Sequence, residues 1–224
     1  MSGILMLNNK NYTATGNLRL GGDGKPLFTS TVLCDNSSAS SSLVLTDDYH
    51  NYDFVEFELT NSSTSAVTKI FTTPDAIDAI YNVTTDMVLN EFNNNQYAEY
   101  TYSSQTNTFN RVNHRNCDCT KITGYVCSNL TVTETEIFKA NSRSSTPVSI
   151  SSTGLLGYDF LIVAANNADS TSIVPCNNIV SYSDAPIDSY GYAFNGYNST
   201  QYVAITDTTM SSAPYLYVGG IKFT

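Results

Sequence analysis

Charged residues are scarce in this chain of 224 residues: they make up 13% of the sequence, against about 25% in an average globular domain. Only 10 residues are Lys or Arg while 20 are Asp or Glu, so the formal net charge is −10. Nucleic acids and anionic membranes are bound by clustered cationic side chains, and the sequence contains no basic run. We therefore expect neither a nucleic-acid partner nor docking to anionic lipid.

Tryptophan is absent, and no stretch of 18 apolar residues is present that could cross a bilayer as a helix. The first ten residues lack the charged region, long apolar core and cleavage site of a secretory signal peptide. We therefore expect no membrane insertion and no export by the usual secretory route.

Cysteine is also sparse, and its number is odd. The five residues are spaced irregularly, at Cys34, Cys117, Cys119, Cys127 and Cys176. A secreted disulfide scaffold is shorter and denser in cysteine. We expect free thiols that pack as small hydrophobic groups.

In place of charge, the chain carries hydroxyl, amide and aromatic groups, including 16 Tyr and 10 Phe. Thr, Val, Ile, Tyr and Phe favour strands, and Ser, Asn and Gly favour turns. Val55, Phe57 and Leu59 alternate with residues 54, 56 and 58, which is the pattern of a strand with one buried face. The sequence predicts an all-β fold of short strands, arranged as a jelly-roll-like sandwich.

Further strands are predicted at residues 97–102, 122–127, 158–165, 202–206 and 215–218. Turn signals between them are residues 93–95, 166–167, 177–178 and 219–220. One short helix is expected at residues 74–80, where proline occupies the first position and Ile77 and Ile80 lie three apart.

The sequence also contains an internal repeat. Residues 31–45 match residues 136–150 at an offset of 105, and residues 52–57 match residues 158–163 at an offset of 106. Residues 93–97 match 198–202, and a shorter offset relates the segments around Gly124 and Gly220. We interpret the chain as two tandem β-sandwich copies, residues 28–130 and 131–224. Residues 1–27 form either an attachment arm, the interpretation adopted here, or a first strand of copy one.

Metal and catalytic patterns are weak. His114 with Cys117, Cys119 and Cys127 could hold zinc, but structural zinc sites favour two to four residues between paired cysteines. Calcium could bind near residues 47–53 through Asp47, Asp48 and Asp53, although the EF-hand spacing is absent. Buried thiols and a solvated turn explain these patterns more simply, so we predict no metal and no cofactor.

Catalysis has no recognisable signature either. Neither His50 nor His114 lies in a nucleophile elbow or a metalloprotease helix. A glycoside hydrolase would need two carboxylates facing each other across a cleft. The candidates are Glu91, Glu99, Glu134 and Glu136. Since nothing in the sequence pairs them, we predict no enzyme activity.

The strongest binding signal is a loop rich in tyrosine and asparagine near the C-terminus. Its candidate ligand-binding residues are Tyr190, Tyr192, Asn195, Tyr197 and Asn198. Tyrosine supplies a large rigid contact area, and asparagine supplies adaptable hydrogen bonds, which suits sugars or proteins. Residues 93–102 are the counterpart in copy one, and ordinary strand-edge tyrosines remain an alternative interpretation.

Residues 31–41 read Thr-Val-Leu-x-x-Asn-Ser-x-x-Ser-Ser, followed by an apolar pair and then by Tyr-Asp-Phe at residues 52–54. This pattern resembles the β-sandwich modules of bacteriophage tail and fibre proteins, over residues 30–127 and more weakly over 133–224. Cys34 stands where those modules often carry tryptophan, so the match is loose at that position.

The resemblance implies a non-enzymatic structural protein of a virion, assembled in the host cytoplasm and expected as a homotrimer. The arm would contact other virion proteins, and the sandwiches would bind a host-surface glycan or protein. Other functions left open by the sequence are a head-fibre or capsid decoration protein, a small glycan hydrolase and a free lectin.

Overall fold

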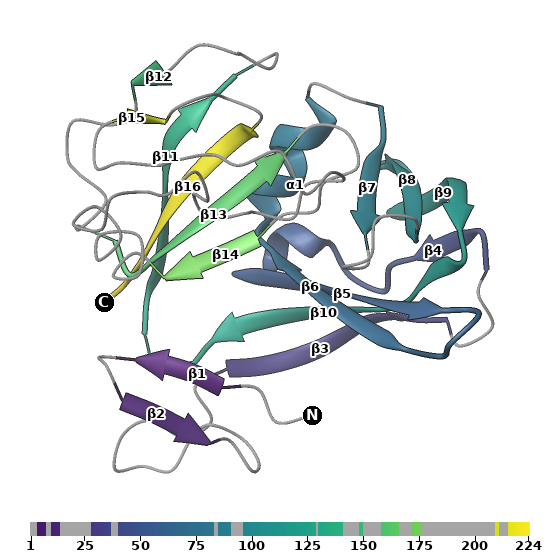
Figure 1. Cartoon of the computed structure of the whole chain (residues 1–224), viewed down its shortest axis with the longest axis horizontal. Coiled ribbons are helices and arrows are strands. Elements are labelled where there is room, and N and C mark those ends of the chain that lie inside the picture. The colour runs from purple at the N-terminus through teal and green to yellow at the C-terminus, as the bar shows by residue number, and fades with distance from the viewer. Residues whose placement is uncertain are drawn as a thin grey trace.

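The computed structural model shows an all-β molecule with one short α-helix among the residues it describes, as the sequence predicts (Figure 1). The structure describes residues 4–7, 10–13, 28–36, 40–82, 85–90, 96–128, 130–140, 148–149, 158–165, 172–175, 209–210 and 215–224. All strand pairings within this described part are antiparallel.

Unit one, residues 28–127, contains two four-stranded sheets. Its main sheet has the order β3-β10-β5-β6, and its second sheet has the order β4-β9-β8-β7. The main sheet comprises β3 (Phe28–Asp35), β10 (Cys117–Cys127), β5 (Phe54–Asn61) and β6 (Val67–Thr72). The second comprises β4 (Ser42–Val44), β9 (Thr108–Arg115), β8 (Tyr97–Ser103) and β7 (Met87–Asn90).

The two sheets of unit one pack face to face around a continuous apolar core. The predicted alternation on β5 is confirmed for its inward side, because Val55, Phe57 and Leu59 are fully buried. The ring of Phe57 lies edge-on to the ring of Phe109 on the facing sheet, with centroids 5.6 Å apart. Complete burial of each such side chain contributes about 1.5–3 kcal/mol, so this core is the main source of stability in unit one.

Unit two, residues 131–224, has a main sheet of the same construction. The order is β11-β16-β13-β14, again first strand, last strand and then the two strands of a hairpin. These are β11 (Val132–Lys139), β16 (Tyr215–Phe223), β13 (Phe160–Ala165) and β14 (Ser172–Pro175). A short pair, β12 (Val148–Ser149) with β15 (Thr209–Met210), corresponds to β4 with β9 of unit one.

The strand registers of the two main sheets agree as well. At the centre of each sheet, a glycine of the last strand pairs with one residue of the first strand (β3 or β11) on one side. On its other side it pairs with one residue of the first hairpin strand (β5 or β13). The two sets are Gly124, Thr31 and Val55 in unit one and Gly220, Thr135 and Leu161 in unit two. This agreement supports the repeat predicted from the sequence, and an origin by duplication stays a prediction.

Both glycines lie directly beneath a tyrosine ring. A Cβ atom on Gly124 would overlap the ring of Tyr52, and one on Gly220 would overlap the ring of Tyr158. The pair Gly219–Gly220 lies inside strand β16, so the turn predicted at this position is wrong. Glycine occurs here because a neighbouring side chain fills the space above the strand, rather than because the backbone reverses.

The aspartate that follows each tyrosine ties the strand to the same neighbour. The backbone N–H of Cys127 donates to Asp53 Oδ2 at 2.7 Å, and that of Phe223 donates to Asp159 Oδ2 at 2.9 Å. Each aspartate also uses its own N–H to reach a carbonyl of the last strand. These bonds occur at the same place in both units, and we call the Tyr-Asp motif with its bonds to the last strand the latch.

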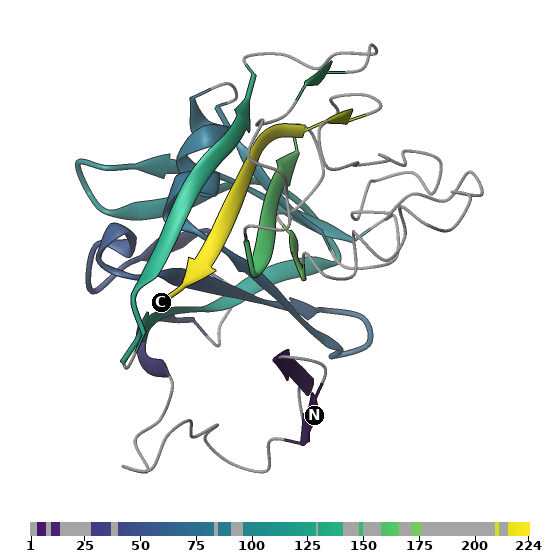
Figure 2. The same cartoon turned by 90° about the vertical axis from the view of Figure 1, so that its left-hand side faces the viewer.

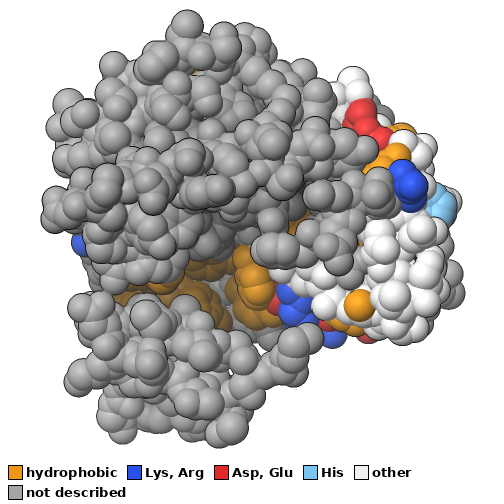
Figure 3. Space-filling view, in the orientation of Figure 1, with side chains coloured by type: hydrophobic (Ala, Val, Ile, Leu, Met, Phe, Trp, Pro, Cys, Tyr) orange, Lys and Arg blue, Asp and Glu red, His pale blue; other side chains and the backbone are white. Residues whose placement is uncertain are grey.

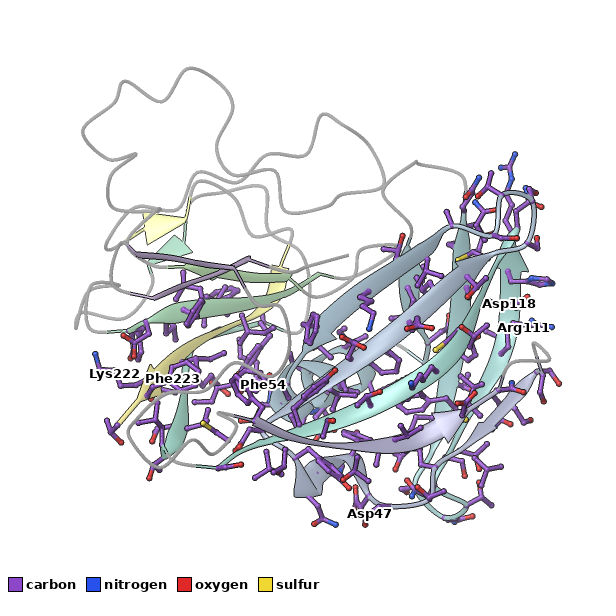
Figure 4. All side chains as sticks on the ribbon, turned by 90° about the horizontal axis from the view of Figure 1, so that it is seen from below. Asp47, Phe54, Arg111, Asp118, Lys222 and Phe223 are labelled. Carbon is purple, nitrogen blue, oxygen red and sulfur yellow. The ribbon has the colours of Figure 1, made fainter. Side chains whose placement is uncertain are left out.

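The predicted helix is present as α1 (Pro74–Tyr81), and Thr73 caps its N-terminus by accepting a hydrogen bond from the N–H of Ala76. The helix packs against β13 and β16 of unit two, and Figure 2 shows it behind that sheet. At the other side of the junction, Phe54 of unit one stacks on Phe223 of unit two, with ring centroids 6.3 Å apart (Figure 4). The two units therefore share one apolar core.

The N-terminal segment forms a separate hairpin at the bottom of Figure 1, in which β1 (Ile4–Leu7) pairs with β2 (Lys10–Thr13). Its predicted role as an attachment arm stays a prediction. In the described ranges, no helix has the length and apolar character needed to span a membrane.

Candidate binding face

The five loop residues predicted to bind a ligand, Tyr190, Tyr192, Asn195, Tyr197 and Asn198, lie outside the described residues. Their counterpart in copy one, residues 93–102, is described from Gln96 onward and forms β8. The side chains of Ala98 and Tyr100 are buried, so the alternating residues Tyr97, Glu99 and Thr101 lie on the opposite, outer side of the strand. This outward row is the starting point of a candidate site.

We call the outer side of the second sheet of unit one the polar face. Its members carry hydroxyl, amide, carboxylate and phenol groups, and they come from β4, β8 and β9. They are Ser42, Tyr97, Glu99, Thr101, Asn110 and Asn113. The register places them together, since Thr101 pairs with Asn110, Glu99 with Asn113 and Ser42 with Asn110.

Hydrogen bonds between neighbouring strands fix several of these groups. The hydroxyl of Ser42 donates to Asn110 Oδ1 at 2.9 Å, and Nδ2 of Asn113 donates to the phenol oxygen of Tyr97 at 3.1 Å. Partial burial, together with the hydrogen bond that protonated Glu99 donates to the carboxylate of Asp86, raises the pKa of Glu99 above its ordinary value. The polar face is therefore pre-organised, which reduces the entropy that a ligand must remove on binding.

Apart from scattered charged and hydrophobic groups, the unit-one side of Figure 3 shows mainly backbone and side chains that are neither hydrophobic nor charged. Such groups exchange hydrogen bonds with neutral hydroxyls and amides without the desolvation cost of buried charge. A single tyrosine ring, Tyr97, supplies a flat apolar surface at one end of the row. The combination suits a sugar or a polar protein surface.

His50 lies in a cluster of carboxylates that serves the fold. Its Nδ1 is 2.6 Å from Asp48 Oδ1, and its Nε2 is 3.1 Å from Asp78 Oδ2. The hydroxyl of Tyr49 donates to the other oxygen of Asp78 at 2.6 Å. Burial alone would lower the pKa of His50, but the bonds to the two aspartates outweigh it and raise the pKa. The ring therefore joins the short helix η1 (Tyr49–Asn51) to α1.

The aspartates considered for calcium are each engaged with protein donors. Asp47 accepts from the backbone N–H of Asp48, from the phenol of Tyr52 and from the side chain of Asn51, and Asp48 accepts from the N–H and the ring of His50. These bonds hold the pKa values of both carboxyls below the ordinary range. Asp53 belongs to the latch described above. The part of the chain that the structure describes contains no group of three or more residues able to hold a metal ion.

The cysteines considered for zinc are not gathered at one place. Cys117 and Cys127 stand at opposite ends of β10, and His114 is exposed on β9. Cys119 and Cys127 are buried free thiols, as the sequence predicts, Cys117 is buried as well, and Cys34 is half-buried. Burial raises the pKa of Cys119 strongly, which leaves the thiol protonated. Cys176 lies outside the described residues.

The carboxylates considered for glycan hydrolysis lie on different sheets. Glu99 is on β8 of unit one, whereas Glu134 and Glu136 are on β11 of unit two. Glu136 is exposed, and its Oε2 lies 3.9 Å from Nζ of Lys139. Glu91 lies outside the described residues.

Glu134 is the group whose role sequence reasoning missed. Its Oε1 accepts from the hydroxyl of Tyr217 of the same unit at 2.8 Å and, across the junction between the units, from that of Thr73 at 3.1 Å. The carboxylate lies over Gly219, where a Cβ atom would overlap it. Burial raises the pKa of Glu134 to about 7, although the two hydroxyl donors act in the opposite direction. The partners come from distant segments, so no local sequence signal identifies them.

A partly buried ion pair, Arg111 with Asp118, joins the second sheet to the main sheet at the far end of unit one (Figure 4). His114 lies beside it, with Nδ1 3.5 Å from Asp118 Oδ1.

No protein-family model matches the chain, and no curated protein and no solved structure matches it either.

Proposed function

We propose that this chain is a non-enzymatic structural protein of a bacteriophage virion, located in the tail or a fibre, that binds a host-surface glycan or protein. The resemblance of residues 31–54 to tail and fibre modules is the reason for placing it in a virion. The polar face of unit one is the observation that supports a binding role, because it offers ordered hydroxyl, amide and phenol groups on a rigid sheet.

Chemical groups that often signal catalysis have structural partners in the described part of this chain. The ring nitrogens of His50 lie within hydrogen-bond distance of the carboxylates of Asp48 and Asp78. The carboxylate of Asp53 accepts a hydrogen bond from the N–H of Cys127. Such engagement supports binding rather than catalysis. The predicted loop around Tyr190 and Tyr192 would then act as a second contact region on the same chain.

Two experiments separate this proposal from its alternatives. Antibody labelling of purified virions should place the protein on tails or fibres, whereas labelling of heads would favour a capsid decoration protein. Purified protein should bind the cells on which the virus grows, and the double variant Tyr97→Ala with Asn113→Ala should bind at least about tenfold more weakly, a loss of about 1.4 kcal/mol.

Ser63→Ala is the matched control, because Ser63 is exposed in the turn after β5, on the other sheet of the same unit. The control should bind like the unaltered protein. Absence of the protein from virions, together with absence of cell binding, would overturn the proposal.

A further inference from the structure

Strand β9 contains a β-bulge opposite the middle of β8. Glu99 of β8 pairs with Asn113, whereas its neighbour Tyr100 pairs with Arg111. Val112 is therefore an extra residue on β9, and its side chain is 55% exposed. A bulge changes the direction in which the following side chains point, and bulges are frequent beside functional sites.

The bulge places Asn113 on the polar face. In a regular strand, residues two apart lie on the same side of the sheet, so Asn113 would share the side of Arg111. Arg111 pairs with Tyr100, whose side chain is buried in the core. Because of the extra residue, Asn113 instead lies beside the outward-facing Glu99, and its Nδ2 donates to the phenol oxygen of Tyr97 at 3.1 Å. A local irregularity of the strand thus completes the polar face.

A chain of hydrogen-bonded side chains crosses the strands β7, β8 and β9, which lie side by side in Figure 1. The amide of Asn113 bonds the carboxylate of Glu99 as well as the phenol of Tyr97. The acid form of Glu99 donates to Asp86, the residue directly before β7. The hydroxyl of Thr85 also donates to Asp86. These bonds hold the groups in place before a ligand arrives, which lowers the cost of binding.

The two carboxylates beside the polar face favour some ligands over others. When both are ionised, the oxygens of Asp86 and Glu99 are hydrogen-bond acceptors only. A sugar hydroxyl donates to such oxygens and brings no charge of its own. A carboxylate, sulfate or phosphate group on a ligand is repelled instead, and the net charge of −10 adds to that repulsion at low salt.

Apolar groups on the same face are single and separate. Val44 on β4 is 61% exposed, Val112 is the bulge residue, and Tyr97 is half-buried at one end of the row. A protein partner is usually held by a cluster of aromatic or arginine side chains at a desolvated centre. A sugar instead presents small C–H patches between its hydroxyls, and these suit a single aromatic face among polar groups. The composition of the polar face therefore favours a glycan over a protein.

We propose that the polar face binds uncharged glycans, and that Asp86 and Glu99 make it reject acidic ones. Tyr97 and Asn113 hold the sugar beside the two carboxylates, which accept hydrogen bonds from its hydroxyls. This inference rests on the binding role proposed above and adds the class of ligand.

Competition on cells tests this selectivity. Oligosaccharides released from the cells on which the virus grows are separated by anion exchange into uncharged and acidic pools. Each pool is titrated, at physiological salt, against fluorescent full-length protein bound to the same cells. The uncharged pool should displace the protein at a concentration at least about fivefold lower, since one added charge about 4 Å from a carboxylate in water has an effect of that size.

Glu99→Gln keeps the shape of the side chain and removes one charge, so it should reduce the preference for the uncharged pool. Glu136→Gln is the matched control, because it removes the same charge from an exposed position in unit two, and it should leave the preference unchanged. Circular dichroism verifies that both variants are folded. If Glu99→Gln does not fold, Asp86→Asn removes the other charge of the pair and should reduce the preference in the same way.

Equal displacement by the two pools, or a preference that loss of either charge leaves unchanged, would overturn the inference and leave the binding role standing. Displacement by cell-surface proteins alone, with neither pool effective, would have the same meaning. If the unaltered protein shows no saturable binding to the cells, the binding role itself is wrong, and this inference is wrong with it.

Discussion

Glu134→Gln is predicted to stabilise the protein at pH 8 and to change little at pH 4.5. In the folded chain, burial raises the pKa of Glu134 to about 7, whereas the ordinary value is 4.5. Between these two pH values the folded state holds a proton that the unfolded state has released. Stability is therefore greatest below the ordinary pKa and is lost as the pH rises through about 7.

The size of the effect follows from the two pKa values. A difference of this size corresponds to about 3 kcal/mol between the two ends of the pH window. Glutamine has the shape of the protonated acid, and its carbonyl oxygen can accept from Thr73 and Tyr217 as Oε1 does now. The variant should therefore exceed the unaltered protein by about 2–3 kcal/mol in unfolding free energy at pH 8.

Urea unfolding of both proteins at pH 4.5, 6, 7 and 8 measures this difference. Subtracting the two curves removes the contributions of other carboxyls, such as Asp47 and Asp48, whose lowered pKa values make stability fall in acid instead. Glu136→Gln is the control, because Glu136 lies on the same strand with an exposed side chain. A difference that does not grow with pH, or a glutamine variant less stable at pH 8, would refute the reasoning.

Three further predictions concern the fold. Gly124→Ala and Gly220→Ala should each cost at least about 1–3 kcal/mol in urea unfolding, because the added methyl group meets a tyrosine ring in both units; a neutral result at either glycine would contradict the latch. The thiol of Cys119 should react with an aromatic disulfide reagent only after denaturation, and modification in the native state would show that β10 opens. Arg111→Ala should cost about 3 kcal/mol because it leaves the partly buried Asp118 without its guanidinium partner, and unchanged stability would mean that water or the neighbouring His114 compensates Asp118.

Sequence patterning predicts the local structure well where a segment is bounded by its own turns and caps. The all-β class, the short helix (predicted at residues 74–80 and observed as Pro74–Tyr81) and the inward side of β5 follow from side-chain periodicity and from proline at the start of a helix. The recurrence of Tyr-Asp at residues 52–53 and 158–159 is visible in the sequence as part of the repeat, whereas the hydrogen bonds of the two aspartates are seen only in the structure.

Periodicity fails where a second layer covers the sheet. The alternation on β5 predicts that Phe54 and Glu56 face solvent, yet both are buried. Phe54 stacks on Phe223, and Glu56 pairs with Lys69. Phe54 and Phe223 come from distant segments, so no window of sequence contains both, and Glu56 meets Lys69 across the β5–β6 hairpin.

The candidate site was predictable only in part. The counterpart segment of copy one pointed to β8, and its outward residues belong to the polar face. Asn110 and Asn113 are recognised as members of the polar face only from the register in which β9 pairs with β8, and the sequence does not specify that register. The loop from Tyr190 to Asn198 lies outside the described residues, so its role in binding stays a prediction.

The most direct test of the binding role is a titration of fluorescently labelled full-length protein onto the cells on which the virus grows. We expect saturable binding that neutral glycan fragments or proteins released from the cell surface compete away, and that Tyr97→Ala with Asn113→Ala weakens. Binding by the double variant equal to that of the unaltered protein, or no saturable binding by either, would contradict the binding role.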